Sequence, residues 1–128
     1  MRAPTAADLT LLARKVWDAV PASLRDLTGE IAILVEEFPD EDTMDEVGAE
    51  TPFDIMGLLR TSSGNPPALV IFRRAILDYW VETGDELSAV LTHVMVHETA
   101  HQLALSEEMV AQLEAEIEAS APLPRTVQ

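Results

Sequence analysis

The fold is decided by the stretch His93-Val94-Met95-Val96-His97-Glu98-Thr99-Ala100-His101. It belongs to a longer run in which apolar residues recur at the three- and four-residue spacings of a helix with one buried face. Those apolar residues are Leu87, Val90, Leu91, Val94, Met95 and Ala100. We therefore predict a long helix that is capped by Asp85 or Thr83 and that ends near Leu103.

Within this helix, the pattern His97-Glu98-x-x-His101 is typical of a zinc site. Residues four apart are separated by about 40° around a helix and about 6 Å along it, so both imidazoles can reach one cation. Glu98 would lie beside the water that the metal activates and take its proton as the general base. Zinc makes that water more acidic and polarises the scissile carbonyl. The pattern predicts a hydrolase, and the alternatives are a helix with solvated histidines or an idle bound metal.

A zinc site of this kind needs a third protein ligand, and the chain contains no cysteine to supply it. His93 would stretch the site over three helical turns, about 12 Å, so we expect it to line the cleft or to pack behind the ligands. A carboxylate in the first turn of the next helix is the better candidate, and we favour Glu107 over its neighbour Glu108. Two later carboxylates would serve only if that helix ran back across the site, and are otherwise expected to be solvated: Glu114 and Glu118.

The remaining segments predict an α+β domain. A helical stripe at residues 6–20 should end at Pro21, because proline has no amide hydrogen to continue a helix. Further elements are predicted as strands at residues 30–38, 53–60 and 68–73, an acidic loop or helical turn at 40–50, a turn or loop at 62–67 and a short helix at 75–81. Ser106 should cap a last helix, and the tail from Ser120 should fray. The order of elements predicts one sheet that helices cover on one face.

The composition is that of one compact domain. The chain has 128 residues, 48% of them hydrophobic, which is enough for one core and too few for two. Its net charge is −15, from 8 basic and 23 acidic residues, and such a field repels nucleic acid. The first residues lack an apolar signal core and no run nears the roughly 18 apolar residues of a membrane span, so we expect a cytoplasmic protein. The acidic surface either aids solubility or steers cationic peptides, and the oligomeric state stays open.

Beyond the helix, segments at residues 35–40, 51–58, 71–80 and 105–109 share the sequence character of one family. Together with residues 93–101, they make the chain similar to the small bacterial zincin-like metallopeptidases, also called minimal or neutral zinc metallopeptidases. The resemblance implies a single zincin-like domain over residues 1–128, with an N-terminal helix, a mixed sheet of about three to four strands, the active-site helix and a C-terminal helix. It also implies a zinc-dependent peptidase acting on a peptide or protein substrate. A weak or inactive binding protein of the same fold is the alternative.

The family pattern H-E-x-x-H-x-x-G-x-x-D implies a role for each matching residue. His97 and His101 match the two histidine ligands, and Glu98 matches the general base. Glu107 stands at the position of the aspartate that is the third metal ligand. Ala104 stands where the pattern has glycine, and a left-handed backbone there would strain alanine by about 1 kcal/mol.

The hydrolysis hypothesis also needs a place for the substrate. An extended peptide would lie along a strand edge, for which residues 68–73 are the candidate. A further donor would stabilise the oxyanion that forms during hydrolysis. The candidates for that donor are His93, Arg73, Arg74 and Tyr79.

Overall fold

The computed structural model describes residues 3–120, and the predicted tail after Ser120 lies outside this range. The elements in chain order are α1 (Ala6–Ala19), α2 (Ala22–Thr28), β1 (Ala32–Glu36), α3 (Glu41–Val47), β2 (Gly57–Ser62), β3 (Asn65–Phe72), α4 (Arg73–Thr83), α5 (Leu87–Gln102) and α6 (Glu107–Ser120). This confirms the predicted α+β class with its long histidine-bearing helix and C-terminal helix. No helix in the described range is long and apolar enough to cross a membrane.

The strands form a mixed sheet in the order β1-β3-β2, in which β1 runs parallel and β2 antiparallel to β3. The prediction of a turn or loop at residues 62–67 is confirmed at Ser63 and Gly64, where φ of Gly64 is 82° and the β2–β3 hairpin turns, but it is too long, since Asn65, Pro66 and Pro67 belong to β3. The prolines Pro66 and Pro67 are compatible with this hairpin because β1 pairs with β3 only from Ala68 onward. The first residues of β3 therefore need fewer amide donors than the rest of the strand, which pairs on both sides.

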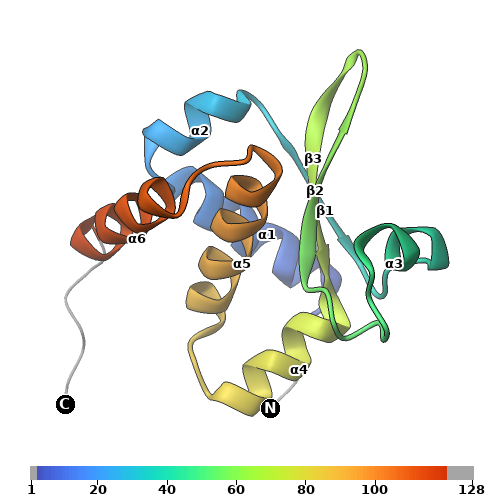
Figure 1. Cartoon of the computed structure of the whole chain (residues 1–128). Helices are drawn as coiled ribbons and strands as arrows, with labels where there is room; N and C mark the ends of the chain where they lie inside the picture. The colour runs from blue at the N-terminus through green and yellow to red at the C-terminus, as the bar shows by residue number, and fades with distance from the viewer. Residues whose placement is uncertain (1–2, 121–128) are drawn as a thin grey trace.

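Both faces of β3 are buried, as expected for the central strand of a covered sheet. Leu69 and Ile71 belong to the main core, which the sheet shares with α1 and α5. Val70 and Phe72, on the opposite face, form a smaller cluster with Ile55. Figure 1 shows α3 on this second side of the sheet, away from α1 and α5. The expectation that helices cover only one face is therefore wrong.

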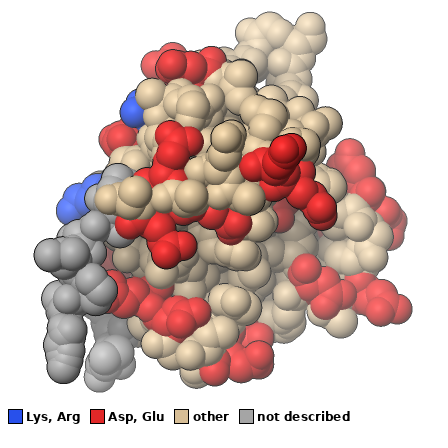
Figure 2. Space-filling view, turned by 60° about the vertical axis from the view of Figure 1, so that its left-hand side comes forward, with Lys and Arg blue, Asp and Glu red and all other residues tan. Residues whose placement is uncertain are grey.

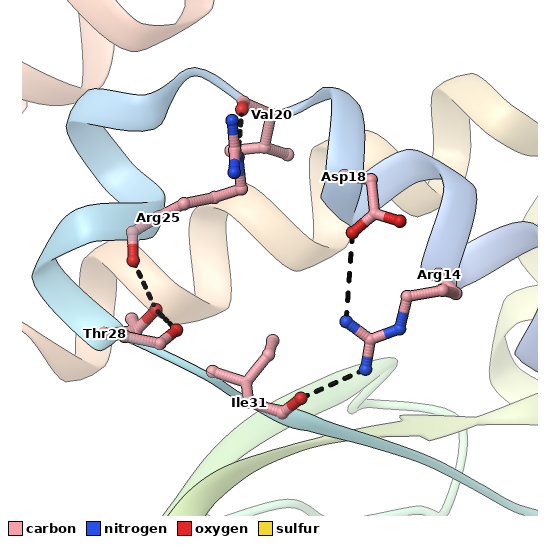
Figure 3. A network of polar contacts seen from close by, with 7 residues as sticks. Arg14, Asp18, Val20, Arg25, Thr28 and Ile31 are labelled. Carbon is pink, nitrogen blue, oxygen red and sulfur yellow. Dashed lines mark hydrogen bonds and ion pairs between the residues drawn. The ribbon is translucent and has the colours of Figure 1, made fainter.

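The N-terminal helices are joined to the sheet by a network of polar contacts (Figure 3). Arg14 of α1 donates to the carbonyl of Ile31 at 3.0 Å, just before β1, and Arg25 of α2 donates to the carbonyl of Val20 at 2.7 Å. Pro21 follows the end of α1 as predicted, but it also begins α2, a helix that has no counterpart among the predicted elements. These contacts fix the direction in which the chain enters the sheet.

The histidine-bearing helix α5 is the most deeply packed helix of the fold (Figure 1). Its buried residues are Val90, Leu91, Val94, Met95, Val96, Thr99 and Ala100. The predicted cap is wrong, because Glu86 occupies the N-cap position and makes no side-chain capping bond. Gly57 lets the helix approach the sheet, since a Cβ atom there would lie 3.1 Å from Val94 Cγ1 and 2.9 Å from the Val70 carbonyl oxygen. The helix is therefore held by close packing rather than by a polar cap.

Candidate metal centre

The three histidines follow one another along α5 at four-residue intervals and turn gradually around the helix. His93 and His101 are exposed, while His97 and Glu98 are half-buried. Each interval of four residues rotates the side chain by about 40°, so His97 lies between the directions of the other two histidines. Glu98 is about 100° from His97, on the same side as His101. The helix thus presents two neighbouring faces that carry different chemistry.

One face of α5 borders an open cleft of about 740 Å³. Glu98, His101 and Gln102 line it from α5, and the edge strand β2 lines it opposite with Leu58, Leu59, Arg60 and Thr61. The far wall consists of the end of α3 and the segment before β2, namely Glu46, Val47, Gly48, Ala49, Asp54, Ile55 and Met56. His97 does not line this cleft. The structure therefore brings Glu98 and His101 together at one cavity and turns His97 away from it.

The environment of Glu98 suits a general base. Burial raises the pKa of its carboxyl group, and the nearby His101 and His97 only partly oppose this rise. A carboxylate with a raised pKa holds an abstracted proton more firmly than a solvated one, which favours proton transfer near neutral pH. Glu98 therefore lies at the cleft with a raised pKa, and its role as general base stays a prediction.

The neighbouring face of α5 meets α6, and ligand-type side chains gather there. The rings of His93 and His97 lie 4.1 Å apart between centroids, with their planes tilted by 34°, and His97 Nε2 lies 2.8 Å from Glu114 Oε2. One candidate ligand atom from each of these three residues lies within 4.8 Å of the other two. Burial and the proximity of His97 lower the pKa of His93, which favours the neutral imidazole that binds metals. This cluster can hold a metal ion.

The turn between α5 and α6 contains the non-glycine residue of the described chain with a positive φ, Ala104 at 56°. The amide of Leu105 donates to the carbonyl of Ala100, and the amide of Ala104 donates to the carbonyl of His101, each at 3.0 Å. This is the Schellman arrangement, whose left-handed residue is usually glycine. Ala104 therefore has the left-handed backbone at which alanine is strained. The Ser106 hydroxyl then accepts from the amide of Met109 at 3.2 Å and begins α6 as predicted.

The sequence-derived ligand set is only partly assembled. Glu107 and Glu108 lie exposed in the first turn of α6, and within residues 3–120 neither they nor His101 belong to a cluster of three ligand atoms like that of His97. Glu114, which we expected to be solvated unless α6 ran back across the site, is the carboxylate that contacts His97. The assignment of His97, His101 and Glu107 as metal ligands stays a prediction.

None of the residues predicted as oxyanion donors lines the cleft, and the two arginines among them already contact other residues. Arg73 donates to Glu37 Oε1 at 2.9 Å and to the carbonyl of Pro4 at 2.8 Å, and Arg74 lies over the Phe38 ring. Neither of them, nor His93 or Tyr79, lines the cleft. The cleft cation is instead Arg60 of β2, which donates to Thr43 Oγ1 at 2.9 Å. No sequence signal marks Arg60, because nothing near it in the chain resembles a motif.

The comparisons with known proteins agree with this fold. The sequence model of a family described as "zincin-like metallopeptidase" matches residues 28–117. No curated protein matches the chain. Among solved structures, a conserved hypothetical protein from Thermo thermophilus is similar, with a TM-score of 0.51 and 17% sequence identity. The similarity covers 84% of this chain and 99% of that one, and at this identity it establishes a shared fold.

Proposed function

The chain belongs to the zincin-like metallopeptidase family, and on this basis we propose that it is a zinc-dependent peptidase acting on a peptide or protein substrate. The observation that carries the proposal is the position of Glu98. This half-buried carboxylate, with a raised pKa, shares one cleft with His101 and with the edge of a strand. In this proposal Glu98 is the general base, His101 a metal ligand and the edge of β2 the peptide-binding surface, and all three border the same cavity.

The donor set of α5 and α6 fits a zinc ion. Imidazole nitrogen and carboxylate oxygen are the ligands that zinc takes when cysteine is absent. His97 and His101 would hold the ion, and Glu107 would be the third ligand because it occupies the position of the family's aspartate. Forming this set requires His97 to exchange its contact with Glu114 for one shared with His101. A bound zinc ion supplies the Lewis acidity that activates water and polarises a substrate carbonyl.

Glu98 carries the proton transfers in this proposal. Its carboxylate accepts a proton from the attacking water and returns it to the amine that leaves the cleaved peptide bond. Partial burial keeps the carboxylate basic and limits competing hydrogen bonds from solvent. The carboxylate is held in place because Thr99 and Ala100, which follow it on α5, are buried in the fold.

The edge of β2 is the surface on which the substrate would lie. The expectation that residues 68–73 provide this edge is wrong, since β3 pairs with β1 on one side and with β2 on the other. Within residues 3–120, β2 has a strand neighbour on one side only, and its residues face the cleft. An extended peptide can add to such an edge through main-chain hydrogen bonds. The acidic side chains of Glu46 and Asp54 on the far wall favour a peptide with basic residues.

A second candidate function is that of a binding protein that keeps the fold without turnover. The exposed position of Glu107, the strained turn at Ala104 and the contact of His97 with Glu114 all favour it. In that case the cleft would hold a peptide, or the helices a metal ion, but no bond would be cleaved.

The test is the turnover of zinc-loaded protein on a broad peptide library, with Glu98→Gln as the decisive variant. Loss of the general base is expected to lower kcat by about 10²- to 10⁴-fold while the zinc content stays at the wild-type level. Glu118→Gln, a change of the same kind on an exposed residue of α6, is the matched control and should leave kcat unchanged. If Glu98→Gln and the wild-type protein cleave equally, or neither cleaves any peptide, the binding protein is the correct function.

A further inference from the structure

We propose that His93, His97 and Glu114 form a second position for a divalent cation such as zinc, and that this position competes with the peptidase ligand set for His97. The inference rests on the proposed function, since that function makes His97 a ligand of the other set. It assigns a regulatory role to His93 and Glu114, which the family pattern does not use. The two positions would lie on neighbouring faces of one helix.

The geometry of the cluster is close to that of a bound ion. Ligand atoms in a tetrahedral zinc site are about 3.4 Å apart when the bonds are about 2.1 Å long. In the structure one ligand atom each from His93, His97 and Glu114 lies within 4.8 Å of the others, and the pair from His97 and Glu114 is at 2.8 Å. Small side-chain rotations would complete the site, because these residues already lie on facing helices and need no backbone change.

The surroundings also favour a cation. His93 and Glu114 are exposed, so an ion can enter from solvent. Figure 2 shows many acidic side chains and few basic ones on the side of the molecule that carries α6. The whole chain has 23 acidic and 8 basic residues, and a field of this sign raises the local concentration of cations.

The two positions exclude each other because they share one residue, His97. A neutral imidazole offers a single lone pair at its unprotonated nitrogen, so His97 can bind one ion at a time. In the structure Nε2 of His97 faces Glu114 rather than the cleft. An ion held there would keep His97 away from His101, and the ion would lie beside α6 instead of beside Glu98.

Exclusive binding gives a particular kinetic signature. When one ion divides between two positions on the same chain, the fraction in each depends only on the ratio of the two affinities and not on the zinc concentration. Saturating zinc would therefore leave a fixed share of the molecules inactive. Removing the second position should raise kcat and leave KM unchanged, since the cleft and the strand edge are unaltered.

The decisive experiment removes the peptidase ligands and titrates the metal-free full-length chain with zinc chloride in a calorimeter. The double variant His101→Gln, Glu107→Gln is expected still to bind one zinc ion per chain. Adding Glu114→Gln should weaken this binding by at least about 100-fold, the upper end of what is lost when a residue that merely supports a ligand is removed. Adding Glu118→Gln instead is the matched control and should change nothing. Circular dichroism confirms that each variant is folded.

The proposal is overturned if the double variant binds zinc no better than His97→Ala, or if adding Glu114→Gln leaves its affinity unchanged. The converse pair, His93→Gln with Glu114→Gln, separates this failure from failure of the proposed function. That pair should retain one zinc ion and gain kcat. If it binds no zinc while the first double variant does, the peptidase ligand set is wrong and the second position stands.

Discussion

The wall of the cleft that α5 forms and the far wall are held together in different ways. The α5 wall is packed into the main core through residues such as Leu91 and Met95, which are fully buried. The far wall has one buried apolar residue, Ile55, and is otherwise held by carboxylates: Asp40 accepts from the amide of Thr43 at 2.8 Å, and Asp54 accepts from the amides of Glu50 and Thr51 at 2.9 and 3.0 Å. Apolar packing is insensitive to pH, whereas such caps depend on ionised carboxylates. The motif-bearing wall is therefore the rigid one, and the far wall is the adaptable one.

The largest expected effect comes from the rigid wall. Leu91→Ala removes a fully buried side chain from α5 and should lower the free energy of unfolding by about 3–5 kcal/mol, since the core cannot fill the cavity completely. Leu11→Ala is the matched control, because Leu11 is 69% exposed on α1, and it should change stability by less than about 0.5 kcal/mol. Urea denaturation measures both. If Val47→Ala, on the far wall, lowered the free energy of unfolding as much as Leu91→Ala does, the contrast between the two walls would be wrong.

The next effect is expected where α5 packs against the first residue of β2. Gly57→Ala places a methyl group 2.9 Å from the Val70 carbonyl oxygen and 3.1 Å from Val94 Cγ1, and should cost about 1–3 kcal/mol. Adding Val94→Ala removes the second contact but not the first. A double-mutant cycle should therefore show a partial rescue that chemical denaturation resolves. If the two substitutions change the free energy of unfolding additively, Val94 of α5 does not limit the space around residue 57.

A smaller effect of opposite sign is expected at the end of the rigid wall. Ala104→Gly relieves a left-handed backbone with φ of 56°, and the gain exceeds the added entropy of glycine in the unfolded chain by about 0.5–1 kcal/mol. Ala111→Gly, in the exposed interior of α6, is the matched control and should instead lose about 1 kcal/mol. Equal losses at both positions in thermal denaturation would show that the Schellman turn is not strained.

The sequence predicts well those elements that are long and periodic. The helices at residues 6–20 and 87–103 are predicted to within a few residues, because their apolar stripes are dictated by burial in one core. The short helix α2 escapes prediction because Ala22–Thr28 buries only Leu24, which leaves almost no stripe to detect. The turn or loop predicted at residues 62–67 is found only at Ser63 and Gly64, because prolines usually exclude strands and only the register with β1 shows that Pro66 and Pro67 are tolerated in β3.

The candidate site also has features that the sequence predicts and features that only the structure shows. The roles predicted for His97, Glu98 and His101 rest on their spacing along one helix, and the glycine of the family pattern raises the question of a left-handed backbone at Ala104. Which carboxylate meets His97 depends on how α6 leaves that turn. Leu113 is the buried residue of α6 within the described chain, so few sequence signals fix the direction of the helix. The contact with Glu114 therefore needed the structure.

The smallest expected effect, and the sharpest test of the comparison, is the response of the far wall to acid. The hydrogen bonds with Thr43 hold the pKa of Asp40 below its usual value of 3.8, and those with Thr51 and Glu50 do the same for Asp54. A lowered folded-state pKa means that the stabilisation is complete above the unfolded pKa and is lost as the pH falls through the folded one. The window therefore lies below about pH 4.

Hydrogen exchange of the Thr43 amide, compared at pH 5 and pH 3 after correction for intrinsic rates, measures this loss locally. Its protection should fall across the window, while the amide of Met95, inside the packed α5, should keep its own. Asp40→Asn supplies the control, because asparagine also caps a helix but does not titrate, so the acid dependence at Thr43 should disappear. If the amides of Thr43 and Met95 lose protection together, acid unfolds both walls of the cleft at once. The far wall would then not change its structure independently of α5.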